Sequence, residues 1–124
     1  MTGQTARQDL LAAAQRAGAP ASAHLQVTAR CHCTCVHCYQ VRSAEGELTF
    51  AEIARVLAEL ADAGALLLGI TGGEPFVRDD ADAIVAEARR RGFAVKLLTT
   101  GHFLDDERCR RLRDLGAISV DLSV

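Results

Sequence analysis

Four cysteines within eight positions are the strongest sign of chemistry in this sequence. Three of them, Cys31, Cys35 and Cys38, stand at C-x3-C-x2-C spacing, which lets a single loop wrap three thiolates around one metal centre. No fourth thiol stands at a matching distance, because Cys33 lies inside the motif and Cys109 lies far down the chain. If these thiolates held a four-iron, four-sulfur cluster, one iron would have no cysteine ligand and could bind a substrate or cofactor. In an electron-transfer cluster, by contrast, four cysteines occupy all four irons.

The cysteine loop and three later motifs occur in a fixed order along the chain. Tyr39 follows the last cysteine, and the later motifs are Thr71-Gly72-Gly73-Glu74-Pro75, Leu98-Thr99-Thr100-Gly101 and Val120-Asp121-Leu122-Ser123-Val124. In this order, over roughly residues 24 to 124, they resemble the signature of the radical S-adenosylmethionine (radical SAM) enzymes. Three features depart from that signature: Cys33 replaces a usually apolar residue, Thr100 stands where Asn is usual, and only about two-thirds of the family's barrel is covered.

The resemblance implies a [4Fe-4S] cluster held by Cys31, Cys35 and Cys38, with S-adenosylmethionine chelating the open iron. Reductive cleavage of that cofactor would give a 5′-deoxyadenosyl radical, which abstracts hydrogen from an unactivated position. The reductant would be a protein such as ferredoxin or flavodoxin. The Cys-Tyr end of the loop and the Gly-Gly-Glu-Pro-Phe form resemble the peptide-modifying and cofactor-maturing members, so a peptide is one expected substrate.

By the same resemblance, the loop at positions 71–75 would hold the methionyl ammonium of S-adenosylmethionine through backbone carbonyls and Glu74. Glycine lets the backbone approach a ligand closely, and Pro75 makes the loop rigid. His37 or Tyr39 could stack on the adenine, or both could be ordinary loop residues, and Thr99 could equally be a turn residue. The expected cofactor-binding residues are Gly72, Gly73, Glu74, Pro75, His37, Tyr39, Thr99 and Ser123.

The composition is that of an ordinary globular chain. The 124 residues make one domain or part of one, and 49% are hydrophobic but only 4% aromatic, so Ala and Leu carry the burial. A net charge of −2 favours neither nucleic acid nor membrane surfaces, and no apolar run approaches the roughly 20 residues of a membrane span. Without a secretory signal pattern, and with clustered cysteines, we expect metal binding in a reducing cytoplasm.

Alternating apolar patterns predict four strands with helices between them. A flanking helix at 4–17 lies in a leading segment, 1–22, and the core unit spans 23–124. We expect strands at 24–30, 65–70, 93–99 and 118–124. Thr49 and Glu52 form a capping box that starts the first intervening helix, Asp79 or Asp80 starts the next, and the last spans 104–115. The continuous apolar run at 65–70 predicts a strand buried on both faces.

The strand and helix order predicts a parallel sheet with right-handed crossovers. In the last strand Val120 and Leu122 alternate with Ser119 and Asp121, and this polar row favours a barrel lumen over an open sheet. The resemblance implies the same fold class, α/β, as a partial (β/α)6 barrel with about four parallel strands. Because active sites in such folds lie at the carboxyl ends of the strands, we expect the motifs to share one rim.

Other interpretations of these residues stay open. The clustered Cys and His residues could hold a structural zinc without catalysis, although zinc gives no role to the Gly-Gly-Glu-Pro motif. The chain could also be an incomplete piece of a larger enzyme, since a terminal barrel strand leaves an unpaired sheet edge. We expect Cys33 to point away from the cluster, because the spacing is satisfied without it, and Cys109 to be buried on a helix face shared with Leu112.

Overall fold

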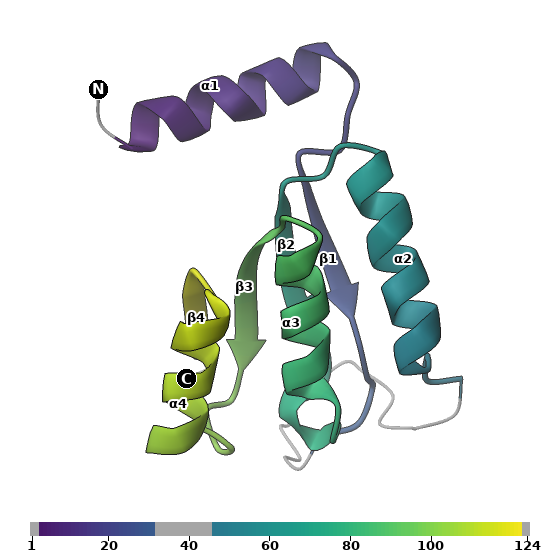
Figure 1. The fold of residues 1–124 in the computed structure, drawn as a ribbon, viewed down its shortest axis with the longest axis vertical. Helices are drawn as coiled ribbons and strands as arrows, with labels where there is room; N and C mark the ends of the chain where they lie inside the picture. Colours follow the sequence, from purple (N-terminus) through teal and green to yellow (C-terminus); the bar gives the residue numbers. More distant parts are fainter. Residues whose placement is uncertain (1–2, 32–45, 123–124) are drawn as a thin grey trace, which may run out of the picture.

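The computed structural model describes residues 3–31 and 46–122. The elements in chain order are α1 (Gly3–Arg16), β1 (Ser22–Gln26), α2 (Phe50–Asp62), β2 (Leu67–Thr71), the 3-10 turn η1 (Pro75–Val77), α3 (Ala81–Arg90), β3 (Ala94–Thr99), α4 (Asp106–Leu115) and β4 (Ser119–Leu122). The strands form one parallel sheet in the order β1-β2-β3-β4 (Figure 1). The predicted α/β class with four parallel strands and intervening helices is confirmed.

The core lies between the sheet and the three helices α2, α3 and α4, which cover one face of it (Figure 1). Strand residues that face these helices are buried, and the register pairs Leu68 with Val95 and Ile70 with Leu97. Ile53 of α2 packs into the same core. Helix α1 lies beyond the amino ends of the strands, at the far end of the sheet from their carboxyl ends (Figure 1). No helix among the described residues is long and apolar enough to cross a bilayer.

Local sequence signals set the limits of the helices. The predicted capping box is present: the Thr49 amide donates to Glu52 Oε2 at 3.0 Å, and the Glu52 amide donates to Thr49 Oγ1 at 3.2 Å. Gly116 ends α4 with a φ of 88°, a left-handed conformation that glycine adopts without a Cβ penalty. Asp80 occupies the position before α3, but its side chain makes no capping bond there, because it binds Arg78 instead.

Two predicted strands differ from those observed. The first ends at Gln26 and not near residue 30, because the carbonyls of Thr28 and Arg30 turn to accept bonds from the loop after β2. The second starts at Leu67 and not at residue 65, and Leu66 before it is exposed. The predicted burial on both faces holds in the middle of the strand, where Leu68, Gly69 and Ile70 are buried, whereas the end residues Leu67 and Thr71 are half-buried.

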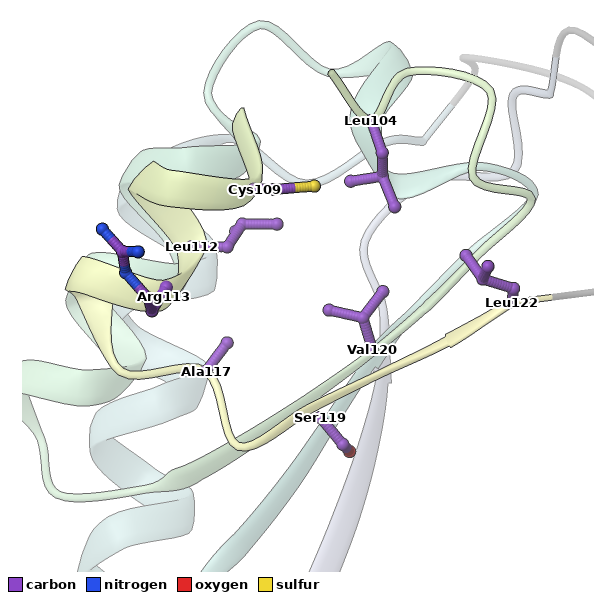
Figure 2. Close-up of a pocket in the computed structure, with 8 residues that line it drawn as sticks. All are labelled: Leu104, Cys109, Leu112, Arg113, Ala117, Ser119, Val120 and Leu122. Carbon is purple, nitrogen blue, oxygen red and sulfur yellow. The ribbon is translucent and has the colours of Figure 1, made fainter. Parts of the chain in front are cut away.

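The predicted burial of Cys109 is wrong. Leu112 packs into the core, whereas Cys109 is exposed. Both residues line a hollow of about 290 Å³ between α4 and β4, where Val120 and Leu122 point toward the helix and Ser119 points away (Figure 2). The apolar row of β4 therefore faces α4, and the predicted polar row lies on the opposite face.

Candidate functional site

The described motif residues gather at the carboxyl ends of the strands. Cys31 follows β1 and is half-buried, the Gly-Gly-Glu-Pro motif follows β2, and Thr99 ends β3 (Figure 1). This shared rim is the one predicted from the strand order. Several predicted site residues lie outside the described residues: Cys35, Cys38, His37, Tyr39 and Ser123, together with Cys33.

The two glycines after β2 press against the backbone that leads to Cys31. The Gly73 amide donates to the Thr28 carbonyl at 2.9 Å, and the Glu74 amide donates to the Arg30 carbonyl at 2.8 Å. A Cβ on Gly72 would lie 2.6 Å from the Thr28 carbonyl oxygen, and one on Gly73 would collide with the Arg30 carbonyl. Glycine is therefore required here by close approach of two backbone segments, and the loop and the first cysteine are held side by side.

Glu74 is fully buried, with 0% of its surface exposed. Its Oε1 accepts bonds from Thr99 Oγ1 at 2.6 Å, the Thr100 amide at 2.8 Å and Thr100 Oγ1 at 3.0 Å. Its Oε2 accepts from the Phe76 amide at 2.9 Å. A buried carboxylate is tolerated when such donors surround it. Glu74 thus ties the loop after β2 to the turn after β3.

This arrangement gives Thr99 and Thr100 a definite role. Both hydroxyls donate to Glu74, so the Thr at position 100, where the resemblance expects Asn, still supplies a side-chain donor to the buried carboxylate. The Thr99 hydroxyl also accepts a bond from the Gly101 amide at 3.2 Å, which shapes the turn. Among the described residues, these two threonines bond to other groups of the protein and so shape the loops at the rim.

A second polar cluster, which the sequence did not reveal, joins the two segments that flank the cysteine motif, residues 27–30 and 46–48. Glu47 accepts bonds from Thr28 Oγ1 and from Arg30 Nε and Nη2, and Arg78 pairs with Asp80. Burial raises the pKa of Glu47, but the bonds from Thr28 and Arg30 outweigh it and the net pKa is lowered. The bonds from Arg78 likewise lower the pKa of Asp80.

These residues carry little signal in the sequence. Arg78 and Asp80 stand two positions apart just after the Gly-Gly-Glu-Pro motif, a spacing that could have suggested a local pair. Arg30 and Glu47 are separated by the whole cysteine segment, and no periodicity links them. A hollow of about 300 Å³ beside this cluster is lined by residues of both flanks, 26–29 and 46–48.

The donor set fits an iron–sulfur cluster. Soft thiolates are its usual ligands, and the spacing supplies three of them from one loop. The described residues alone contain no group of three metal-binding side chains, since Cys31 is the one predicted ligand among them. Cys31 directly follows Arg30, whose carbonyl is bonded to the Gly-Gly-Glu loop, so a group bound at this thiol would meet that loop.

Comparisons with known proteins agree with this arrangement. The sequence model of the radical SAM superfamily matches residues 25–124. Fe-coproporphyrin III synthase of Methanosarcina barkeri is 34% identical over 101 residues, which cover 79% of this chain and 25% of that protein. PqqA peptide cyclase of Streptomyces rochei is 34% identical over 110 residues, covering 86% of this chain and 30% of that protein. The chain therefore spans less than a third of the length of these curated relatives.

Solved structures share the fold. The crystal structure of Streptococcus suis SuiB bound to precursor peptide SuiA matches with a TM-score of 0.76 and 21% identity, over 98% of this chain and 28% of that one. BtrN in complex with AdoMet and 2-DOIA matches with a TM-score of 0.72 and 22% identity, over 83% of this chain and 45% of that one. At this identity the likeness concerns the fold alone. The family assignment follows from the sequence match across residues 25–124: this chain belongs to the radical SAM superfamily.

Proposed function

We propose that residues 23–124 form the N-terminal portion of the core domain of a radical SAM enzyme, with residues 1–22 as a flanking unit. The observation that carries this proposal is the bonding of the Gly-Gly-Glu loop to the backbone directly before Cys31. The first cysteine and the Gly-Gly-Glu loop are thereby adjacent. When bound, a reduced [4Fe-4S] cluster supplies the electron that cleaves S-adenosylmethionine, and the cleavage enables hydrogen abstraction from an unactivated carbon.

The residues of the chain have separate tasks in this proposal. Cys31, Cys35 and Cys38 would hold the cluster as thiolates, and an iron without a cysteine ligand would be open to S-adenosylmethionine. The Gly-Gly loop would hold the methionyl ammonium through its backbone carbonyls. Glu74 keeps that loop in place through Thr99, because its carboxylate oxygens are already engaged by protein donors.

The cofactor contacts proposed at His37, Tyr39 and Ser123 would complete the adenosine side of the site. Each contact is tested by a single substitution, which should lower the affinity of the chain for S-adenosylmethionine and leave its iron content unchanged. Thr99 contributes to the site through Glu74, and its hydroxyl is the donor that such a test would remove.

We propose a peptide as the substrate class and a ferredoxin or flavodoxin as the electron donor, in the cytoplasm. Support for the peptide comes from the curated relative named PqqA peptide cyclase. The polar face of the sheet, on which Lys96 pairs with Asp121 at 2.8 Å, is the surface that would look into the barrel.

The experiment is anaerobic reconstitution of the chain with iron and sulfide, followed by metal analysis and equilibrium dialysis with S-adenosylmethionine. We expect about four irons per chain and binding of S-adenosylmethionine that depends on the cluster. Cys31→Ala is the control, and it should lose both. Stoichiometric zinc with no iron, or binding of S-adenosylmethionine that is equal with and without the cluster, would contradict the proposal.

A further inference from the structure

The cysteine segment of this chain has two ends, and the described residues show how those ends are joined. Residues 27–30 lead into Cys31, and residues 46–48 lead from the segment into α2. All three proposed cluster ligands stand between these flanks in the sequence. The distance between the flanks therefore limits which arrangements the three thiols can adopt.

Glu47 joins the flanks from one side. Its Oε1 accepts from Arg30 Nε at 3.0 Å, and its Oε2 accepts from Arg30 Nη2 at 3.1 Å. Thr28 Oγ1 donates to the same carboxylate. Two parallel bonds between guanidinium and carboxylate fix orientation as well as distance. The Glu47 side chain is 17% exposed and that of Arg30 is 40% exposed, so solvent screens this pair only in part.

Arg78 also joins the two flanks, through hydrogen bonds to their backbone. Its Nη1 donates to the Val27 carbonyl at 2.9 Å and to the Leu48 carbonyl at 2.7 Å, one on each flank. Asp80 holds the guanidinium from the other side with bonds of 2.7 and 2.8 Å. The Arg78 side chain is 6% exposed, and its Nη1 lies 3.8 Å from Glu47 Oε2.

An ordinary surface ion pair does not account for this arrangement. Exposed ion pairs contribute little to stability. Here the buried guanidinium of Arg78 donates to two backbone carbonyls, those of Val27 and Leu48, that are 21 positions apart in sequence. The pair of Arg30 and Glu47 then spans the same gap a second time. Arg78 also belongs to the segment that follows the Gly-Gly-Glu-Pro motif, so it couples both flanks to the proposed cofactor loop.

We propose that a root clasp, made of Thr28, Arg30, Glu47, Arg78 and Asp80, is a set of positioning residues for the iron–sulfur cluster. The clasp joins the two flanks of the cysteine segment before metal binds. The entropy cost of bringing these ends together is then part of folding and does not weaken metal binding. The inference rests on the proposed function. In this proposal the members of the clasp act through the placement of the thiolates.

The test compares Glu47→Gln with Glu87→Gln in the reconstituted chain. Glu87 is a matched control, because its side chain is 13% exposed and also pairs with two arginines, Arg90 and Arg91, but on α3. Iron release to a chelator is followed by absorbance, and urea unfolding of the same variants is recorded separately. We expect Glu47→Gln to release iron about three- to tenfold faster than wild type, the effect of losing a partly screened charged pair. Glu87→Gln should release iron at the wild-type rate.

Arg30→Gln and the double variant Arg30→Gln/Glu47→Gln separate positioning from general weakening. Because Glu47 also accepts from Thr28, Glu47→Gln should have at least the effect of Arg30→Gln, and the double variant should release iron no faster than the worse single one. Wild-type release rates in Glu47→Gln, equal acceleration in Glu87→Gln, or multiplying effects in the double variant would overturn the clasp.

A second readout keeps this inference distinct from the proposed function. Cobalt(II) is titrated into the metal-free chain, and thiolate binding is followed by the sulfur-to-cobalt charge-transfer absorption. If no iron–sulfur cluster forms but Glu47→Gln still weakens cobalt binding relative to Glu87→Gln, the proposed function fails and the clasp stands. Equal cobalt affinity in the two variants, or no cobalt binding by the wild-type chain, would overturn the clasp.

Discussion

Glu74→Ala is the substitution whose effect follows most directly from the structure. It removes an acceptor from four bonds, of which those from the Phe76 amide and Thr99 Oγ1 are buried. The two donors of Thr100 are only partly buried and can turn to water. A buried donor left without an acceptor costs about 1–3 kcal/mol, so two of them lower the free energy of unfolding by about 2–6 kcal/mol. That is a large share of the roughly 5–15 kcal/mol that stabilises a domain.

Urea unfolding followed by circular dichroism measures this loss. Glu52→Ala is the matched control, because Glu52 is an exposed carboxylate with one capping bond to the Thr49 amide, and its loss should cost about 1 kcal/mol or less. A loss below about 1 kcal/mol in Glu74→Ala, equal to that of the control, would refute the buried network. We also expect Glu74→Ala to bind S-adenosylmethionine more weakly while it retains its iron.

Three further changes test other parts of the account. Gly73→Ala drives a Cβ into the Arg30 carbonyl and should lower the free energy of unfolding by about 1–3 kcal/mol in the same urea assay; an unchanged midpoint contradicts the close approach. Asp80→Asn should cost stability at neutral pH and progressively less in acid: the pKa of Asp80 is lowered by Arg78, so the contribution is present above the ordinary value of about 3.9 and is lost as the pH falls through the folded-state pKa. A cost that does not change as the pH falls contradicts that pairing. Cys33→Ala should keep the iron of the reconstituted chain, which metal analysis measures, and loss of iron there would overturn the ligand assignment, whereas alanine should abolish iron binding at Cys31, Cys35 or Cys38.

Much of the fold was predictable because it follows from local patterns. The capping box of Thr49 and Glu52 and the turn at Gly116 are encoded within a few residues of one another. The alternation of strands and helices then leaves a parallel sheet as the natural arrangement. The gathering of Cys31, the glycine loop and Thr99 at one rim follows from that topology alone, without any side-chain detail.

What the sequence did not reveal depends on contacts between distant segments. The bonds of Glu74 to Thr99 and Thr100 join residues that are 25 and 26 positions apart, and no periodicity predicts such bonds. The pair of Arg30 and Glu47 is hidden for the same reason. Helical spacing placed Cys109 on the same face as Leu112, and both residues line one hollow, but Leu112 packs into the core whereas Cys109 is exposed.

The central claim is that three thiolates hold a cluster with one iron open to S-adenosylmethionine. Electron paramagnetic resonance tests it most directly, on the chain reconstituted anaerobically, reduced, and measured with and without S-adenosylmethionine. We predict the signal of a reduced four-iron cluster that shifts when S-adenosylmethionine is added. A cluster signal that does not respond to S-adenosylmethionine, or a chain that holds zinc and gives no cluster signal, would contradict it.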